Sequence, residues 1–300
     1  MGGTPTFLIV GAARAGTTAL YDLLQQHPQI AMSTIKEPNF FAFEGEPLDW
    51  CGPGNEFVNN SISNWTDYVS LFETAPAAIA RGEASPLYLW APQAAKRIKA
   101  RLPDVKLIAV LRNPIEQAFS HYLYARAQMI EPLDDFGAAL EAEPERLAAH
   151  WQPLFQYSDF PRYAKQLKRY YAEFSADQIL VFLYEDFRDD PKAMLRKIFA
   201  FVGVDASFAP NVTVETNMGG QPRHAWLQHL VMRPNVLATL AALIVPMGAR
   251  RKIRDMVSRR NLARDHMPAD ARARLKGLLR DDILQLQDLI DRDLSHWLRD

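Results

Sequence analysis

Cysteine is nearly absent from this chain, and neither sign of charge is in excess. Cys51 is the single cysteine among 300 residues, which excludes an internal disulfide framework and a zinc site built from cysteines. Lysine and arginine number 34 against 35 aspartate and glutamate residues, so the formal net charge is -1 at pH 7. Because no overall positive field is available to recruit nucleic acid, no nucleic-acid partner is expected.

Long hydrophobic runs are also absent. The longest apolar stretch, residues 236–247, is about half the length needed to span a bilayer, so no transmembrane segment is expected. The N-terminus has no basic region, and its first apolar run, residues 7–10, is too short for a signal peptide. The single cysteine fits a reducing compartment. Together these features favour a cytoplasmic protein.

Metal-binding patterns are missing too. The seven histidines are scattered and form no H-E-x-x-H or similar motif, so no metal site is expected. His27 and His121 lie near the motifs described below, and we interpret them as a helix-end residue and a packing residue.

What the chain does contain is an alternation of apolar strands and amphipathic helices. Residues 7–10 and 106–111 are apolar runs typical of strands buried on both faces of a parallel sheet. A helix is expected after each of them, over residues 17–27 and 114–128. The other expected elements are a strand at 79–85 between helices at 65–72 and 92–102, a helix at 160–174, a strand at 179–183 and a helix at 191–202. This alternation predicts an α/β fold, with a phosphate-loop-type parallel sheet flanked by helices.

The C-terminal third is expected to be mainly helical. Leucines and isoleucines recur at helical spacing over residues 269–294, which indicates a helix that docks through one face. Residues 33–64 lack a sustained period and are interpreted as a long excursion over the carboxyl edge of the sheet. No repeat, low-complexity tract or Gly/Ser linker interrupts the chain, so residues 1–300 are expected to form a single domain.

Residues 11–18 match a phosphate-loop pattern, G-x-x-x-x-G-[KT]-[ST], in which Thr17 stands at the lysine position. Such a turn between a strand and a helix directs backbone N–H groups toward the positive end of a helix dipole, where a phosphate can bind. The alternative is an ordinary strand-to-helix turn that contains glycine and threonine. The residues expected to bind phosphate are Gly11, Arg14, Ala15, Gly16, Thr17 and Thr18.

The missing lysine narrows the classes of reaction that this loop can support. Nucleoside triphosphate enzymes use that lysine to reach the β- and γ-phosphates, and the following Ser or Thr binds magnesium. The cation of this loop is instead Arg14, three residues before the lysine position. An arginine inside the loop can contact the bridging oxygen of a shorter leaving group, where charge develops as the bond breaks.

A second candidate anion site follows the strand at 106–111. Arg112 comes at the carboxyl end of that strand, the edge where open α/β sheets bind ligands, and Ser120 lies eight residues further on. The arginine offers a planar fork suited to a phosphate, and the serine adds a hydroxyl donor. The alternative is a capping arginine that pairs with Glu116 or with a carbonyl group.

Taken together, the two motifs resemble those of the sulfotransferases that use 3′-phosphoadenosine 5′-phosphosulfate (PAPS), in the prokaryotic branch related to heparan-sulfate-type enzymes. Residues 36–41 and 83–88 look like the family's K-E-P-x-F-F and E-x-(S/T)-P-x-Y segments. Residues 217–223 resemble its late nucleotide-covering loop, and residues 280–282 and 293–297 resemble its C-terminal helix. The likeness spans essentially the whole chain.

The resemblance implies in-line transfer of the sulfuryl group of PAPS to a hydroxyl or amine acceptor. The phosphate loop would hold the 5′-phosphosulfate, and Arg112 with Ser120 would hold the 3′-phosphate. The residues implied to cover the nucleotide are Gly219, Gly220 and Arg223.

Glu37 matches the family's catalytic glutamate, which takes the acceptor proton. Phe40, Phe41 and Phe43 would give it an aromatic setting that tunes its basicity for this role. The alternative is a surface carboxylate that pairs with Lys36.

The chain departs from the heparan-type pattern at two cations. Those enzymes carry a lysine where this chain has Arg14, and often another where it has Ala84. Arg14 stays charged and can stabilise the leaving phosphate, but it cannot donate a proton. Lys36 is the candidate for the second cation, so the expected catalytic residues are Glu37, Arg14 and Lys36.

Two other function classes remain open on the sequence. A phosphate-loop kinase or NTPase is disfavoured by the missing lysine and by Arg112, which stands where a magnesium-binding aspartate would be expected. A nonenzymatic nucleotide-binding adaptor is disfavoured by the retention of Glu37. The acceptor, a small molecule or a glycan, is expected to be selected by loops such as 42–64 and 129–158.

Basic residues gather between positions 250 and 264, beside the apolar stretch. They could receive an anionic acceptor or rest against a membrane surface, which makes residues 236–264 the candidate for peripheral membrane contact. The alternative, which we favour, is a solvated helix face.

Overall fold

The computed structural model describes residues 3–73, 78–212, 221–222, 262–263 and 266–299. Three residues predicted to cover the nucleotide, Gly219, Gly220 and Arg223, lie outside these ranges, as does all of the predicted membrane-contact segment except residues 262–263.

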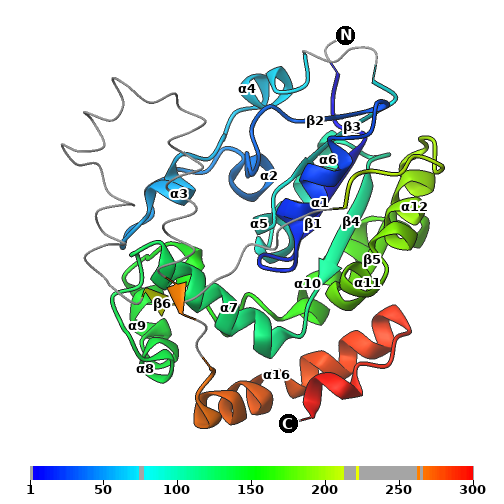
Figure 1. Ribbon diagram of the computed structural model, residues 1–300. Coiled ribbons are helices and arrows are strands. Elements are labelled where there is room, and N and C mark those ends of the chain that lie inside the picture. The colour runs from blue at the N-terminus through cyan, green and yellow to red at the C-terminus, as the bar shows by residue number, and fades with distance from the viewer. Residues whose placement is uncertain (1–2, 74–77, 213–220, 223–261, 264–265, 300) are drawn as a thin grey trace, which may run out of the picture.

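Five parallel strands form the central sheet, in the order β2-β3-β1-β4-β5 (Figure 1). Every residue of the middle strand is buried, because helices cover both faces of a parallel sheet. The predicted α/β fold with a parallel sheet flanked by helices is therefore confirmed. The strands are β1 (Phe7–Gly11), β2 (Ile30–Met32), β3 (Ala80–Ala84), β4 (Lys106–Leu111) and β5 (Ile179–Leu183).

The register of the sheet brings the carboxyl ends of its central strands together. Ile9 of β1 lies opposite Ala84 of β3 on one side and Ile108 of β4 on the other. After β1 the chain builds β2 and β3 on one side, and it then crosses to β4 and β5 on the other. Connections diverge at such a point, and the crevice between them is where open α/β sheets bind ligands.

Close packing of β3 on β1 requires a glycine. A Cβ on Gly82 would lie 2.1 Å from a ring carbon of Phe7, a distance that no side chain can tolerate. This contact lets the two strands pair in the register that aligns their carboxyl ends.

Helices pack on the sheet and on one another (Figure 1). Asn113 begins α7 by accepting hydrogen bonds from the N–H groups of Ile115 and Glu116 ahead of the N1 proline, as its sequence predicts. The N-terminal helices are α1 (Thr17–Leu24), α2 (Phe40–Phe43), α3 (Glu56–Asn59), α4 (Trp65–Ser70), α5 (Leu87–Trp90) and α6 (Ala94–Arg101). The later helices are α7 (Pro114–Ala127), α8 (Phe136–Glu141), α9 (Glu143–Ala148), α10 (Tyr163–Glu173), α11 (Tyr184–Asp189), α12 (Pro191–Val202) and α16 (Ala269–Ile290).

Short elements are where the sequence-based expectations were wrong. The strand β2 and the helices α2, α3 and α5 were not expected, because three or four residues are too few to establish a period. The helix α1 ends at Leu24, before His27, and α10 begins at Tyr163 rather than at residue 160. The six-residue helices α8, α9 and α11 were not expected either, whereas the strands β1, β4 and β5 and the helices α7, α12 and α16 lie within a few residues of their expected positions.

The predicted C-terminal helix is α16, and it docks through one face against α7 and α10, beneath them in Figure 1. Its buried side chains are Ala271, Leu275, Leu279, Ile283 and Leu286. The carboxylate of Asp282 accepts hydrogen bonds from the N–H groups of Ala164 and Lys165, both at 3.0 Å, and so caps the first turn of α10. The C-terminal segment thereby stabilises the helix that packs beside the sheet.

Candidate active site

The turn between β1 and α1 has the geometry of a phosphate-binding loop. A Cβ on Gly11 would lie 2.7 Å from Cβ of Leu89, so only glycine fits where the strand ends. Gly16 has φ +93° just before α1, and Arg14 has φ +62°, which makes it a left-handed residue that is not glycine. No side chain in the described part of the chain caps the first N–H groups of α1, so they can donate to an anion.

The predicted phosphate-binding side chains come together from three elements of the fold. Arg14 lies in the loop, Arg112 follows β4, and Ser120 lies on α7. The Nη1 of Arg112 donates to the carbonyl of Arg14 at 3.2 Å, and Nε of Arg14 lies 3.5 Å from Oγ of Ser120. The guanidinium of Arg14 also stacks over the ring of Tyr124, 4.7 Å from its centroid. We call these four residues the arginine cluster.

The two arginines place like charges close together at the mouth of the loop. Burial lowers the pKa of Arg14, and the charge of Arg112 lowers it further, whereas Tyr124 and Glu37 act in the opposite direction. Arg14 nevertheless remains cationic at neutral pH, because an arginine is not deprotonated in a protein. A bound dianion would offset this repulsion, so the cluster suits a phosphate.

Arg112 also makes the contact that the capping alternative predicted, although its carbonyl partner belongs to the phosphate loop itself. Glu116 is paired with Arg272 instead, and the guanidinium of Arg112 stacks over Tyr184 at 5.4 Å. A Cβ on Gly16 would lie 3.5 Å from the same tyrosine ring. Tyr184 therefore lies between Arg112 and Gly16, at the border of the two predicted anion sites.

Glu37 lies on the turn that follows β2, within electrostatic reach of the arginine cluster. Its N–H donates to the carbonyl of Ala84 at 3.1 Å, and its charge raises the pKa values of Arg14 and Tyr124. Its carboxylate forms an ion pair with Lys36, as the surface alternative predicted. The Glu37 side chain is 45% accessible, so its carboxylate can pair with Lys36 at the surface and still act on Arg14 and Tyr124 through its charge.

Comparison with known proteins connects this arrangement to a family. The model described as "Sulfotransferase family" matches residues 5–208. The chain belongs to this family. The crystal structure of a sulfotransferase from Alicyclobacillus acidocaldarius is similar, with a TM-score of 0.77 and 32% identity over 99% of this chain and 100% of that one. The sulfotransferase interpretation is confirmed, and the kinase alternative is not favoured.

Other known proteins match this chain over only part of their own length. The bifunctional heparan sulfate N-deacetylase/N-sulfotransferase 4 of Mus musculus is 28% identical over 209 residues, which are 67% of this chain and 22% of that protein. The membrane-associated sulfotransferase kil1 of Dictyostelium discoideum is 31% identical over 121 residues, 40% of this chain and 23% of that protein. This chain therefore spans less than a quarter of the length of either. A mouse sulfotransferase complexed with PAP shares the fold, with a TM-score of 0.50 and 15% identity over 93% of this chain and 84% of that one.

Three residues at the site of this sulfotransferase were missed by sequence reasoning. Tyr124 and Tyr184 stack on the two arginines, and Glu83 is fully buried beneath the Glu37 turn. The spacing of four residues between Ser120 and Tyr124 on one helix face was a usable signal. Glu83 begins the segment that resembles the family's E-x-(S/T)-P-x-Y motif, which was a usable signal. No local signal marks Tyr184, because its position depends on which strands are neighbours.

The expected aromatic setting of Glu37 was wrong. Phe40, Phe41 and Phe43 are fully buried in the core rather than around the carboxylate. Asn39, with φ +56°, turns the chain between Glu37 and α2, and this turn directs the phenylalanines inward. Phe40, for example, stacks on Tyr68 at 4.7 Å.

The two histidines near the motifs pack as expected. His27 makes a 3.0 Å hydrogen bond with the carbonyl of Asp205, and its ring contacts Phe199 and Phe208. His121 is buried, and burial lowers its pKa to about 3, so it stays neutral at physiological pH. Among the described residues, no hydrogen bond joins either histidine side chain to a side chain of the arginine cluster.

The described residues contain neither a metal-binding cluster nor a membrane-spanning helix. No group of three or more His, Cys, Asp or Glu side chains among them could hold a metal ion. None of the described helices is both long enough and apolar enough to cross a membrane.

The two loops expected to select the acceptor lie side by side. Cys51 forms a parallel bridge with Trp151, and the rings of Trp50 and His150 stack at 4.4 Å. Gln152 extends the contact by donating its N–H to the carbonyl of Cys51 at 3.0 Å. The loops 42–64 and 129–158 therefore form one surface.

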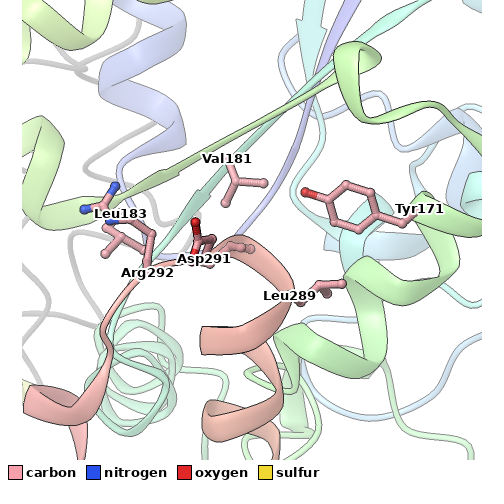
Figure 2. Close-up of a pocket in the computed structure, with 7 residues that line it drawn as sticks. Tyr171, Val181, Leu183, Leu289, Asp291 and Arg292 are labelled. Carbon is pink, nitrogen blue, oxygen red and sulfur yellow. The ribbon is translucent and has the colours of Figure 1, made fainter.

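A separate cavity of about 310 Å³ opens between β5, α10 and the end of α16 (Figure 2). Tyr171, Val181 and Leu289 point toward its centre in Figure 2. Its other lining residues are Leu183, Ile290, Asp291 and Arg292. None of these residues belongs to the arginine cluster, so the cavity is distinct from the phosphate loop.

Proposed function

We propose that this sulfotransferase moves the sulfuryl group of PAPS to a hydroxyl or amine group of an acceptor. The observation that carries the proposal is the convergence of Arg14, Arg112 and Ser120 at the mouth of the phosphate loop. A neighbour of the same fold is complexed with PAP, the product of this transfer. The convergence supplies cations and donors for a nucleotide whose phosphates lie at two separate positions.

In this proposal the loop residues Gly11 and Ala15–Thr18 bind the 5′-phosphosulfate through backbone N–H groups and the threonine hydroxyls. Arg112 and Ser120 bind the 3′-phosphate. Gly219, Gly220 and Arg223 cover the nucleotide. Residues 221–222, in the same segment, form a short strand that packs against α7, the helix that carries Ser120.

The reaction is an in-line displacement at sulfur. The acceptor oxygen or nitrogen forms a bond to sulfur while the bond from sulfur to the bridging oxygen breaks, and that oxygen leaves with the electron pair. Arg14 stabilises the negative charge that develops on the leaving phosphate. Glu37 takes the proton of the acceptor, and Lys36 supplies a second positive charge beside the transferred group.

The acceptor that we propose is a small molecule or a glycan bound against the joint surface of loops 42–64 and 129–158. We further propose that residues 1–300 act as one domain. The free cysteine, Cys51, is exposed, which supports a reducing, cytoplasmic location.

The experiment that tests the function is transfer of labelled sulfate from PAPS to a panel of alcohols, phenols, amines and glycans. A labelled acceptor that forms with the wild type and not with Glu37→Gln supports the proposal. Absence of transfer to every acceptor class, with the nucleotide bound, would favour the nonenzymatic adaptor instead.

A further inference from the structure

Glu83 is a buried carboxyl that the proposed chemistry does not use. It lies at the carboxyl end of β3 and is 0% exposed. The hydroxyl of Ser85 donates to its Oε2 at 2.8 Å, the hydroxyl of Tyr68 donates to its Oε1 at 3.2 Å, and the hydroxyl of Tyr88 faces the same carboxyl. Among the described residues it forms no ion pair, so hydroxyl groups alone stabilise its charge. Burying an ionised carboxyl without a cationic partner costs folding free energy, which suggests a functional role for Glu83.

The hydroxyl of Ser85 connects Glu83 to the turn that carries Glu37. While Ser85 donates to Glu83, its oxygen accepts the N–H of Asn39 at 3.1 Å. One residue before Ser85, the carbonyl of Ala84 accepts the N–H of Glu37 at 3.1 Å. The end of β3 therefore holds the Glu37 turn at two successive points.

The turn needs such support because two of its non-glycine residues have energetically unfavourable φ angles. Glu37 and Asn39 have φ angles of +61° and +56°, which non-glycine residues adopt at a cost of about 1 kcal/mol each. Without its hydrogen bond to Ser85, the segment would relax toward ordinary backbone angles. The Glu37 carboxylate would then move relative to Arg14.

We propose that Glu83 is a positioning residue of the transfer site, which acts through Ser85 to hold the turn that presents Glu37 to the acceptor. The inference rests on the proposed function, in which Glu37 is the general base. Glu83 itself touches neither the nucleotide loop nor the acceptor loops through any of the hydrogen bonds described above.

The surroundings of Glu83 make this role sensitive to its charge. Burial raises the pKa of Glu83 to about 7, and the charge of Glu37 acts in the same direction, whereas the three hydroxyls lower it. The carboxylate accepts hydrogen bonds from the hydroxyls of Ser85 and Tyr68, and these bonds are stronger when it is ionised. The titratable groups that face it from the packed elements are Tyr21, Tyr68, Tyr88, Tyr170 and Glu37.

Four variants separate positioning from general stability. Ser85→Ala removes the hydroxyl that is hydrogen-bonded to both Glu83 and the N–H of Asn39, whereas Ser85→Thr keeps a hydroxyl at the same place. Glu83→Gln keeps the shape of the side chain and removes its charge. Asp282→Asn is the matched control, because it changes a partly buried carboxyl that holds backbone N–H groups of α10.

The first measurement is hydrogen exchange of the Asn39 amide, which needs no substrate. We expect exchange about threefold to tenfold faster in Ser85→Ala, since the acceptor of the Asn39 N–H is removed and a hydrogen bond of about 1 kcal/mol is lost. We expect the same direction in Glu83→Gln, because the hydroxyl of Ser85 loses the charged acceptor that orients it. Ser85→Thr and Asp282→Asn should leave it at the wild-type rate. Unchanged exchange in Ser85→Ala would overturn the proposal.

The second measurement is transfer to the best acceptor of the panel, together with binding of adenosine 3′,5′-bisphosphate. We expect kcat to fall about tenfold or more in Ser85→Ala and Glu83→Gln, with the nucleotide dissociation constant within about twofold of wild type. Faster exchange with unchanged kcat would overturn the positioning role. If the wild type transfers to no acceptor, the proposed function fails, and the exchange data alone decide whether Glu83 holds the turn.

Discussion

At the scale of single residues, the two arginines of the arginine cluster contact aromatic rings, and neither forms an ion pair with a carboxylate among the described residues. Arg14 stacks on Tyr124 and Arg112 on Tyr184, and aromatic faces attract a guanidinium without removing its charge. Each arginine therefore stays available to an anion. The side chain of Arg112 also donates a hydrogen bond to the carbonyl of Arg14, so the two predicted phosphate sites are in direct contact.

Replacing Arg112 should affect one phosphate of the nucleotide and not the other. Arg112→Ala is expected to weaken binding of adenosine 3′,5′-bisphosphate about 10- to 100-fold, because hydrogen bonds to charged groups contribute about 1.5–3 kcal/mol. Binding of adenosine 5′-phosphate should change much less. Isothermal calorimetry measures both, with Arg292→Ala as a control on an arginine that lines the separate cavity. Equal losses for the two nucleotides would contradict the assignment of the 3′-phosphate.

Replacing Glu37 should greatly lower the rate of sulfuryl transfer and leave nucleotide binding unchanged. Glu37→Gln keeps the shape and removes the base, so single-turnover transfer is expected to fall about 10²-fold or more with bisphosphate affinity retained. Transfer at the wild-type rate would require another base. His121 would be a poor replacement, since burial lowers its pKa to about 3.

At the scale of elements, the phosphate loop depends on backbone conformation more than on side chains. Gly11 is required by the approach of Leu89, whereas Gly16 is required by its positive φ at the start of α1. The loop is also tied to β4, because the N–H of Ala12 donates to the carbonyl of Val110 at 2.7 Å. These contacts fix the backbone that leads into the N-terminus of α1.

A matched pair of glycine variants tests this role. Gly16 and Gly203 both have positive φ, +93° and +82°, and neither would place a new Cβ in a clash. Each alanine substitution should therefore cost roughly 1 kcal/mol of stability through backbone strain. Only Gly16→Ala should also weaken binding of adenosine 3′,5′-bisphosphate, in calorimetry beside thermal unfolding. Equal affinities in the two variants would show that the loop backbone does not contact the nucleotide.

At the scale of the whole molecule, buried carboxyls make stability depend on pH. The pKa of Glu83 is raised by burial to about 7, above its unfolded value, so the folded state binds more protons between about pH 4.5 and 7. The unfolding free energy must therefore fall as pH rises through this range. Glu143, whose pKa burial also raises to about 7, contributes in the same direction.

Substitution of Glu83 isolates its share of this effect. Between pH 5 and 8 the unfolding free energy of Glu83→Gln should rise relative to that of the wild type, by up to about 3 kcal/mol. Urea unfolding at several pH values measures the difference, and other titrating groups cancel between the two proteins. A constant difference across the range would mean that Glu83 titrates with an ordinary pKa.

Ligand-induced stability separates sulfuryl from phosphoryl transfer without knowledge of the acceptor. Magnesium is needed to bridge and neutralise neighbouring phosphates, whereas this loop offers Arg14 to a single phosphate beside the sulfate. Adenosine 3′,5′-bisphosphate at about 100 times its dissociation constant should add about 2.7 kcal/mol of stability, with or without EDTA. Magnesium ATP should add little. A thermal shift with magnesium ATP that EDTA abolishes, and none with the bisphosphate, would contradict the proposal.

The amino-acid sequence by itself determined the parts of the protein that depend on short stretches of chain. The strand, glycine turn and helix at residues 7–24 follow from local patterns, because buried runs, glycine angles and helix caps act within a few residues. The position of Arg112 after β4 was predictable for the same reason. So was the docking face of α16, which a helical period encodes directly.

Only the tertiary structure decided which distant residues meet. The contact of Ser85 with Asn39, the stacking of Tyr184 on Arg112, and the joint surface of the two acceptor loops depend on the order of strands in the sheet. A local pattern specifies that a strand is buried but not which strands flank it, because that choice depends on how all the elements pack together. The direction of Phe40 was mistaken for a related reason, since one turn with positive φ reverses the side that a segment presents to the core.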